Sequence, residues 1–395
     1  MTGDLAAETA LLTSPEAADL LQLALTGDPE VVLPGFTARL DDLHYRPGSE
    51  VTAIYTVSFG EPGRSRTEHL LATTAEVDGG VATLTSEGIS LRVWRHPADP
   101  RLPGLAPACD PATVLEWLTA ADPRQPPAAL HLELLTYRPL RRAVLQATAD
   151  DRQFFLKVMR PGYDDRLAIR QQLLAQADLT VPILTRPAPG VLVSQRIQGH
   201  SLAHSLLVWN RGHGTLPAPA DLVALLDRLP AAVLELPRRP SWSENLDFHA
   251  ATARQQLPDA TDRIDRLAGR VRQVLDAGRH GPLVPTHGDF YEANVFVDGA
   301  TLRFIDVDSV GPGLREDDLA CCLAHLAVLP GLDRHSYGRV PEVLDAWQYG
   351  FELQVDATDL RARTAGVLLS LVSGADPGQA LRRLEIAEHY AASAR

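Results

Sequence analysis

Residues 286–309, THGDFYEANVFVDGATLRFIDVDS, constrain the possible fold more than any other stretch of this chain. The runs VFV and LRFI are typical of short strands, and the pair Asp298-Gly299 between them is a common hairpin turn signal. Because paired strands lie about 5 Å apart, a hairpin here would bring Asn294 and Asp306 side by side. The stretch therefore predicts two oxygen-bearing side chains at the open end of a β-hairpin.

This pair of side chains suits a magnesium ion. Two oxygen donors at this separation can share one Mg²⁺, whose bonds are about 2.0–2.1 Å long. Asp289 lies five residues before Asn294, on the loop that enters the hairpin, so its carboxylate can face the same space. Phosphoryl transfer needs a metal and a lysine on the phosphates and a carboxylate that accepts the proton of the attacking hydroxyl. The hairpin thus predicts phosphoryl-transfer chemistry.

A lysine for this chemistry is present at one position only. The 37 lysine and arginine residues include a single lysine, Lys157, which lies in the strand-like run QFFLKVMR. Lysine is a compact point charge that the planar fork of arginine does not mimic. In a chain that otherwise uses arginine, we expect Lys157 to hold the α- and β-phosphates of a nucleotide.

The composition is that of a globular protein and excludes some partners. The 395 residues are 45% hydrophobic and 22% charged, and the net charge of −13 argues against nucleic acid or an anionic membrane as partner. No apolar run reaches the roughly 18 residues of a membrane span. The first basic residue is Arg39, so a signal peptide's basic region is missing. The odd count of three cysteines indicates no disulfide framework. We expect a cytoplasmic protein.

The pattern along the chain predicts two β-rich blocks and then a helical one. The first block has an expected helix at 15–26 and strands at 37–45, 50–59, 68–77, 80–85 and 89–95, with a turn at Pro47-Gly48. A helix is expected at 112–121, after the proline-rich connector HPADPRLPGLAPACDP, residues 96–111. The second block has expected strands at 131–140, 142–150, 153–160, 181–185 and 190–199 and a helix at 164–177. Beyond about residue 201 the pattern is mostly helical.

The two β-rich blocks share a short sequence echo. Tyr-Arg-Pro precedes a strand in LHYRPGSEVTAIYTV, residues 43–57, and again in LTYRPLRRAVLQATA, residues 135–149. The echo indicates either a duplicated β module or a common turn signal.

Several segments resemble the aminoglycoside phosphotransferase and choline kinase-like family. HGDFYEAN followed by FIDVD is similar to its catalytic and metal-binding segments, and FLKVMR to its lysine strand. VSQRIQGHSL resembles its hinge, and REDDLACCLAHL its helix after the metal site. The layout also resembles actinobacterial phosphotransferases related to maltokinases and other sugar kinases.

The resemblance implies an α+β, bilobal, protein-kinase-like fold with an extra domain in front. Residues 1–125 would form an N-terminal α+β cap-like domain. Residues 126–200 would form the β-rich N-lobe, and residues 201–395 the helical C-lobe with the catalytic loop. ATP and Mg²⁺ would be the cofactors, and a small molecule with a hydroxyl group the acceptor.

The resemblance also implies catalytic and metal-binding roles. Asp289 would be the catalytic base, and Asn294 and Asp306 the magnesium ligands. Lys157 would bind the nucleotide phosphates.

Four more residues would support the site or bind the nucleotide. His287 would brace the catalytic loop, and Asp318 would hold the backbone of that loop. The backbone from Gln195 to Ile197 would hydrogen-bond the adenine.

The phosphate loop departs from the family pattern. The turn before the lysine strand reads RPLRRA, residues 138–143, without the usual glycine. Arg141 and Arg142 would either contact phosphates or be solvated.

The residues around the lysine and the metal also depart from the pattern. No glutamate lies between Glu133 and Glu235 to pair with the lysine, which leaves Gln171, Gln172 or Asp165 as polar candidates. Asp308 would be either a second metal ligand or a solvated carboxylate.

These observations favour a small-molecule kinase that phosphorylates a sugar, amino-sugar, aminoglycoside or choline-like alcohol. The alternative is a pseudokinase-like protein that binds a nucleotide without turnover. A protein kinase is disfavoured, because Asp317 follows Asp306 by only eleven residues, too few for a protein-docking activation segment. The segment 238–249, or Trp347, Tyr349 and Glu352, would either contact the acceptor or serve as helix caps and core. The acceptor and the oligomeric state are not indicated.

Overall fold

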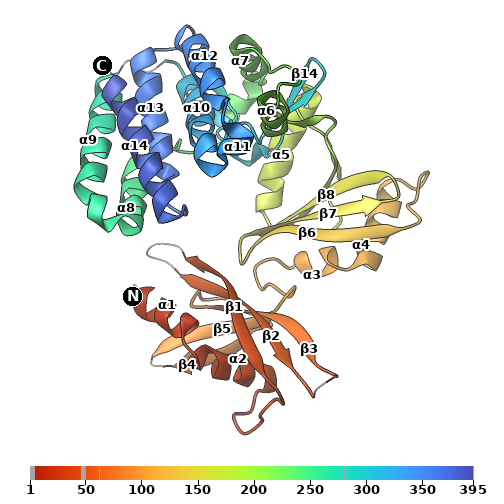
Figure 1. Cartoon of the computed structure of the whole chain (residues 1–395). Helices are drawn as coiled ribbons and strands as arrows, with labels where there is room; N and C mark the ends of the chain where they lie inside the picture. Colours follow the sequence, from red (N-terminus) through yellow and green to blue (C-terminus); the bar gives the residue numbers. More distant parts are fainter. Residues whose placement is uncertain (1–4, 46–49, 62, 87, 279–280, 395) are drawn as a thin grey trace. The chain divides into compact units, whose positions relative to one another are not determined.

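The computed structural model describes residues 5–45, 50–61, 63–86, 88–278 and 281–394. They form two compact units (Figure 1). The first comprises Met1–Ala168 and Ile183–Arg196, and the second comprises Ile169–Pro182 and Ile197–Arg395. The predicted turn at Pro47-Gly48 lies outside the described residues.

The first unit begins with two helices and a five-stranded antiparallel sheet. The elements are α1 (Leu5–Thr13), α2 (Glu16–Thr26), β1 (Thr37–Tyr45), β2 (Val51–Phe59), β3 (Arg66–Thr73), β4 (Ala82–Ser86) and β5 (Ile89–Arg95), with strand order β1-β2-β3-β5-β4. Leu12 and Leu21 of the helices are buried against Val51, Ala53 and Tyr55 of the sheet. The expected strands are confirmed, whereas α1 was not predicted.

The second sheet of the same unit carries Lys157. Its elements are α3 (Leu105–Ala108), α4 (Pro111–Ala121), β6 (Leu130–Arg138), β7 (Arg142–Ala149), β8 (Arg152–Met159), α5 (Tyr163–Gln176), which continues into the second unit, β9 (Ile183–Thr185) and β10 (Val191–Gln195). Alternate residues of the inner strands, such as Leu145 and Leu156, are buried with Leu105 and Leu118 of α3 and α4. These helices therefore cover one face of the sheet.

The two sheets have the same topology. The order β6-β7-β8-β10-β9 repeats β1-β2-β3-β5-β4 strand for strand, and in both cases two helices precede the sheet and pack on one of its faces. Tyr45 pairs with Val51 across the first hairpin, and Tyr137 pairs with Ala143 across the second, at the same spacing. This agreement favours a duplicated β module over a shared turn signal.

The strand register also aligns the buried residues of the two sheets. Alternate buried residues of the second strands correspond one to one: Val51, Ala53, Tyr55 and Val57 with Ala143, Leu145, Ala147 and Ala149. In this alignment the pair Thr52 and Thr73 of the first sheet corresponds to the pair Val144 and Lys157 of the second. The first sheet therefore has a threonine where the second has its lysine.

The second unit is mainly helical. Its helices are α6 (Leu202–Asn210), α7 (Pro219–Asp227), α8 (Leu246–Gln256), α9 (Thr261–Ala277), α10 (Arg315–Leu332), α11 (Arg334–Tyr337), α12 (Val340–Glu352), α13 (Ala357–Ser370) and α14 (Pro377–Ser393), with short 3₁₀ turns at Ala231–Glu235, Pro258–Ala260 and Val307–Ser309. Its strands are β11 (His200–Ser201), β12 (Val284–Thr286), β13 (Val295–Asp298), β14 (Thr301–Phe304) and β15 (Gly311–Gly313). The predicted α+β fold class is confirmed.

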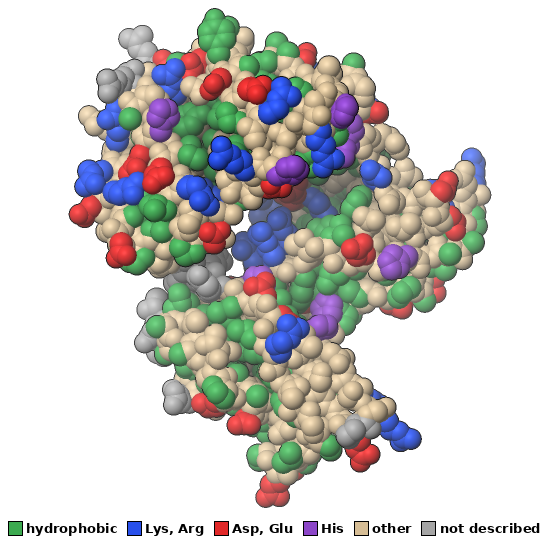
Figure 2. All heavy atoms as spheres, in the orientation of Figure 1, with side chains coloured by type: hydrophobic (Ala, Val, Ile, Leu, Met, Phe, Trp, Pro, Cys, Tyr) green, Lys and Arg blue, Asp and Glu red, His purple; other side chains and the backbone are tan. Residues whose placement is uncertain are grey.

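The surface of the second unit carries mixed charge. Acidic and basic side chains are interspersed on the face of this unit that Figure 2 shows.

Within the described part of the chain, no helix combines the length and the apolar character that crossing a membrane requires.

Candidate functional site

Helix α10 supports the loop that carries Asp289 through hydrogen bonds. The loop follows β12, which pairs with β15, and the carboxylate of Asp318 accepts hydrogen bonds from the backbone N–H groups of His287 and Gly288, both at 2.8 Å. Asp318 is buried. Hydrogen bonds to a carboxylate are stronger than those between neutral groups, so Asp318 fixes the backbone just before Asp289. This geometry fits the predicted role of Asp318, which stays a prediction.

The start of α10 is fixed in turn by a buried arginine. Arg363 of α13, 2% exposed, donates to Asp317 and to Asp359, each at 2.8 Å. Ser243 also donates to Asp317, at 2.9 Å. A buried charge that keeps all its partners is tolerated, whereas removing one partner is strongly destabilising. Sequence reasoning missed this network because its members are distant in the chain.

Gly288 is required by the loop's close approach to the next segment. Its φ is +77°, and a Cβ at this position would lie 2.6 Å from the backbone oxygen of Ser309. Only glycine adopts this conformation freely and leaves the room. The glycine of the HGD motif thus lets the candidate catalytic loop pack directly on the segment after the hairpin.

His287 is buried between the loop and the hairpin. Its Nε2 lies 3.1 Å from the backbone oxygen of Ile305, and its ring packs on Phe304 with the centroids 4.8 Å apart. These contacts tie the loop to the end of β14. They are what the predicted bracing role requires, and that role stays a prediction.

The predicted hairpin is present, and it brings the candidate metal ligands together. β13 pairs with β14 from Val295–Phe304 to Asp298–Thr301, and the N–H of Ile305 donates to the backbone oxygen of Asn294 at 2.9 Å. Asn294 therefore lies opposite Ile305, next to Asp306.

Asn294 also reaches Asp289 on the entering loop. Its Nδ2 donates to the backbone oxygen of Asp289 at 2.9 Å and to Oδ2 of the same residue at 3.4 Å. With Nδ2 engaged on the loop, Oδ1 is the atom of Asn294 that can ligate a metal. The hairpin end thus brings the candidate base and one candidate ligand into direct contact.

Asp306 has a left-handed backbone conformation. Its φ and ψ are 55° and 54°, just before the 3₁₀ turn Val307–Ser309 that contains Asp308. Only a few per cent of non-glycine residues have positive φ, and such strain is concentrated at functional sites. The conformation redirects the chain immediately after the β14 strand. Sequence reasoning did not predict it.

The donors at this site fit a magnesium ion. Mg²⁺ is commonly bound through one or two carboxylates together with substrate phosphates and water. Asp306 and Asn294 would be the one carboxylate and one amide ligand that the protein contributes. Over the described ranges, no group of three or more His, Cys, Asp or Glu side chains is arranged to bind a metal by itself. The residues therefore suit a metal that arrives with phosphate.

Tyr291, two residues after Asp289, belongs to an aromatic pair that the sequence did not indicate. Tyr291 stacks on His325 of α10 with ring centroids 4.1 Å apart. Burial, helped by the charge of Arg383, lowers the pKa of His325 to about 4, so this histidine is neutral at pH 7. Burial, followed by the charge of Asp289, raises the pKa of Tyr291. No local pattern could have found a pair that far apart in the sequence.

The segment 238–249 lies beside the candidate catalytic loop. Arg239, Trp242 and Asn245 line a cavity of about 130 Å³ together with Gly288 and Ser309. This part of the segment is therefore in a position to contact an acceptor.

The second set of acceptor candidates is placed differently. Trp347 is buried in the helical core, Tyr349 is 67% exposed, and Glu352 forms an ion pair with Arg361 at 2.7 Å. Trp347 and Glu352 therefore have structural contacts of their own.

Lys157 lies in the middle of the second sheet. It pairs with Val144 of β7 and Leu192 of β10, while its neighbours Leu156 and Val158 point to the buried face under α3 and α4. Because strand residues alternate between faces, Lys157 belongs to the opposite face. Arg142 lies two positions along β7 from Val144 and shares that face. The sheet thus presents the two basic candidates on one surface.

The turn without glycine is held by Asp99 and Arg160. Leu140 takes φ +61°, the conformation that glycine adopts most easily. Its N–H donates to Oδ2 of Asp99 at 2.7 Å, and its carbonyl accepts from Nε of Arg160 at 2.6 Å. Side-chain hydrogen bonds therefore stabilise a turn that a glycine would otherwise form. The proline-rich connector that supplies Asp99 gave no sign of this role in the sequence.

The polar candidates on α5 have partners of their own. Asp165 forms an ion pair with Arg186 at 2.5 Å, Gln171 donates to the backbone oxygen of Val181 at 3.0 Å, and Gln172 is exposed.

The predicted adenine-binding backbone spans the end of β10. Gln195 is its last residue, and Ile197 is buried at the start of the second unit's long segment. Their contact with adenine stays a prediction.

Substitution of Asp318 should change how stability depends on pH. Burial raises the pKa of this carboxyl to about 7 from 3.8, although the N–H groups of His287 and Gly288 oppose the shift. The folded chain then keeps a proton that the unfolded chain releases near pH 4, so stability falls as pH rises from about 4 to about 7. Asp318→Asn should remove this slope, which is at most about 1.4 kcal/mol per pH unit.

The measurement is the unfolding free energy from urea titrations between pH 4 and 8. The control is Asp298→Asn at the hairpin turn, which should follow the wild-type pH dependence. Parallel curves for wild type and Asp318→Asn would show that the carboxyl is ionised throughout.

Comparison with known proteins gives one family and several similar structures. The model of the Phosphotransferase enzyme family matches residues 140–351, more than half of the 395 residues. No curated protein matches the chain.

Three similar solved structures are kinases. A choline kinase from Cryptosporidium parvum is 10% identical, with 71% of this chain and 95% of that chain covered and a TM-score of 0.49. A choline/ethanolamine kinase family protein from Mesorhizobium loti is 18% identical, with 71% of this chain and 94% of that chain covered and a TM-score of 0.46. A choline kinase from Streptococcus pneumoniae is 14% identical, with 71% of this chain and 98% of that chain covered and a TM-score of 0.47. At these identities and TM-scores, the likenesses say nothing about the acceptor of this chain.

Proposed function

The chain belongs to the Phosphotransferase enzyme family and is a small-molecule kinase, and we propose that it transfers the γ-phosphoryl group of ATP to a hydroxyl of a sugar, amino-sugar, aminoglycoside or choline-like alcohol. The observation that carries the proposal is the contact of Asn294 with Asp289 beside Asp306 at the open end of the hairpin. Phosphoryl transfer requires a base and metal ligands within one small space.

Asp289 is the proposed base. The acceptor oxygen forms a bond to the γ-phosphorus, the bond from that phosphorus to the β–γ bridging oxygen breaks, and ADP leaves with the electron pair. The hydroxyl proton passes to the Asp289 carboxylate. Asp318 keeps the loop backbone in place during this step through its two hydrogen bonds.

Asn294 and Asp306 are the proposed magnesium ligands. When bound, Mg²⁺ would neutralise the phosphate oxygens. Lys157, with Arg142 on the same face of its sheet, is proposed to bind the phosphates of ATP. The backbone from Gln195 to Ile197 is proposed to hydrogen-bond the adenine.

The proposed organisation follows from these roles. Residues 126–200 would serve as the nucleotide-binding lobe and 201–395 as the catalytic lobe, with 1–125 as an additional cap-like domain. The cytoplasm, where ATP is available, is the proposed location.

A screen for the acceptor tests the proposal. Purified protein is incubated with MgATP and a panel of sugars, amino-sugars, aminoglycosides and amino-alcohols. Mass spectrometry should find one acceptor whose mass increases by a single phosphoryl group, with an equal amount of ADP. A magnesium-free reaction is the control and should give no product.

The alternative function is nucleotide binding without turnover. It is motivated by the turn at Leu140, which has no glycine, and by the absence of a glutamate between Glu133 and Glu235. Binding of MgATP without phosphorylation of any acceptor in the panel would favour this alternative.

Substitution of Lys157 by arginine should impair the enzyme although the charge is kept. Guanidinium is larger and planar, so it cannot take the place of a compact ammonium beside the phosphates. We expect kcat/KM for ATP to fall at least tenfold, as a loss of about 1.4 kcal/mol would produce. The control is the reverse swap Arg124→Lys, at an exposed residue before β6 and outside the turn 138–143, which should leave kcat/KM unchanged. Equal activity of the Lys157→Arg variant would contradict a role in binding phosphate.

A further inference from the structure

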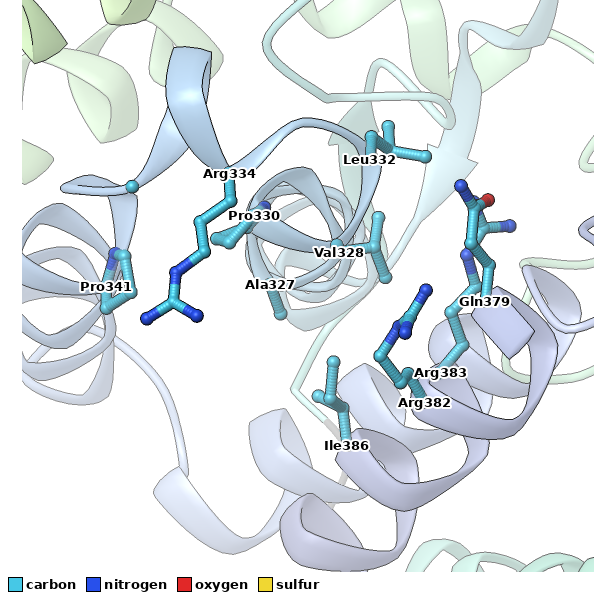
Figure 3. Close-up of a pocket in the computed structure, with 12 residues that line it drawn as sticks. Ala327, Val328, Pro330, Leu332, Arg334, Pro341, Gln379, Arg382, Arg383 and Ile386 are labelled. Atoms are coloured by element: carbon cyan, nitrogen blue, oxygen red, sulfur yellow. The ribbon is translucent and has the colours of Figure 1, made fainter.

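The second unit contains a cavity away from the candidate catalytic loop. Its volume is about 340 Å³, and it is lined by the end of α10, the α11 region, the start of α12 and the first turns of α14. Val328, Leu332 and Ile386 supply apolar walls (Figure 3). Ligand pockets commonly measure about 300–1,000 Å³, so this cavity suits a compact molecule.

Three arginines line the same cavity. Arg334 comes from α11, and Arg382 and Arg383 come from α14. Figure 3 shows the Arg334 side chain lying between Pro330 and Pro341, and the side chains of Arg382 and Arg383 close together on α14. Among the described residues, none of those lining the cavity is acidic. In a chain with a net charge of −13, this cavity is locally basic.

Arg383 lacks the carboxylate partner that comparable arginines have. The half-buried Arg361 and Arg263 form ion pairs with Glu352 and Glu388, both at 2.7 Å. Arg383 instead donates to the backbone oxygen of Leu371 at 2.6 Å and more weakly to Oε1 of Gln379 at 3.4 Å. Within the described part of the chain it has no ion pair.

The lowered pKa of Arg383 agrees with the lack of a carboxylate partner. Burial lowers the pKa of its guanidinium, and the more distant charge of Asp376 opposes the shift only in part. Because a desolvated charge is stabilised by pairing, an anion in the cavity would supply the missing counter-charge.

The cavity is distinct from the proposed catalytic site. Asp289, Asn294 and Asp306 do not line it. Asp318, which holds the catalytic loop, lies in the first turn of α10, and Val328 follows ten residues later. Ten helical residues span about 15 Å.

We propose that this cavity binds a small molecule that carries one carboxylate or phosphate group on a compact apolar body. Guanidinium groups bind the oxygens of these anions in pairs, which gives both strength and orientation. The apolar walls would receive the rest of the ligand. The proposal goes beyond the proposed function and does not depend on it, because it concerns binding at residues that the transfer reaction does not use.

Calorimetric titration with three probes of similar shape tests the charge requirement. Phenyl phosphate, benzoate and the neutral benzyl alcohol are each titrated into the full chain with excess MgADP, so that a nucleotide site does not take up the phosphate. At least one anion should bind at least tenfold more tightly than benzyl alcohol. The ratio of phenyl phosphate to benzoate shows which head group the arginines prefer. Equal binding of the neutral probe, or no binding of either anion, would overturn the proposal.

A double variant locates the binding. Arg334→Gln with Arg382→Gln should weaken anion binding at least tenfold, and it should fold normally because neither side chain forms a hydrogen bond or ion pair among the described residues. The matched control is Arg266→Gln, an exposed arginine on α9 outside the cavity, which should bind as wild type does. Unchanged affinity in the double variant would place the anion elsewhere and refute this site.

Discussion

Asp289→Asn should reduce kcat by about 10²–10⁴-fold, the usual contribution of a positioned general base. The asparagine keeps the size of the side chain and an oxygen that can still accept from Nδ2 of Asn294. It cannot take up the proton of the acceptor hydroxyl. The loss should therefore appear in kcat, with little change in the KM for ATP. Steady-state assays with the acceptor found in the screen measure both constants.

Two controls distinguish the loss of the proton acceptor from damage to the folded structure. Asp298→Asn, at the exposed turn of the same hairpin, should retain wild-type kcat. The dissociation constant of ADP, measured by calorimetry, should be the same for Asp289→Asn and wild type. A kcat close to the wild-type value in Asp289→Asn would assign the base to another residue.

The hairpin could be predicted because its determinants are local. Strand-forming runs, a turn signal at Asp298-Gly299 and polar residues at both ends lie within one short stretch, and β13 and β14 form as expected. The strands of the two sheets were predicted for the same reason, since alternation and turn residues mark each of them. The direct contact of Asn294 with Asp289 then follows from the hairpin and the short loop before it.

The supporting contacts could not be predicted because they join distant parts of the chain. Asp99 stabilises the turn at Leu140 from 41 residues away, and Tyr291 stacks on His325 of another element. Arg363 reaches Asp317 from α13. Composition and periodicity carry no signal for such pairs. The sequence therefore indicated the candidate reacting groups and, through the family resemblance, His287 and Asp318, whereas the contacts of Asp99, His325 and Arg363 became evident only in three dimensions.

Helix α1 and the sheet repeat show two other limits. The apolar residues of Leu5–Thr13 include a neighbouring pair, Leu11 and Leu12, and do not form a clear stripe, so helical spacing was not evident. The Tyr-Arg-Pro echo left duplication undecided, because three residues are a weak signal. The shared strand order and the matching pairs Tyr45–Val51 and Tyr137–Ala143 favour duplication. Thr73 is aligned with Lys157, so only the second copy carries the lysine that is proposed to bind phosphates.

Substitutions of Asp306 should separate its backbone role from its role as a metal ligand. Asp306 has φ 55°, and asparagine and glycine tolerate this conformation whereas alanine does not. Asp306→Asn and Asp306→Gly should therefore unfold near the wild-type denaturant midpoint. Asp306→Ala should lose about 1–2 kcal/mol of unfolding free energy, the cost of a left-handed conformation for a residue that lacks the short polar side chain of aspartate or asparagine. Urea titration of the three variants measures this difference.

Measurements of activity should group the same three variants differently from measurements of stability. Each of the three removes the carboxylate, so each should need at least tenfold more Mg²⁺ for half-maximal activity and should lose most of kcat, regardless of its stability. Asp306→Asn is the decisive variant, because it keeps the fold and an oxygen but not the charge. If Asp306→Asn shows the magnesium dependence of wild type, the strained backbone at this position serves only the fold, and the ligand must be sought at Asp308, which lies two residues further in the 3₁₀ turn.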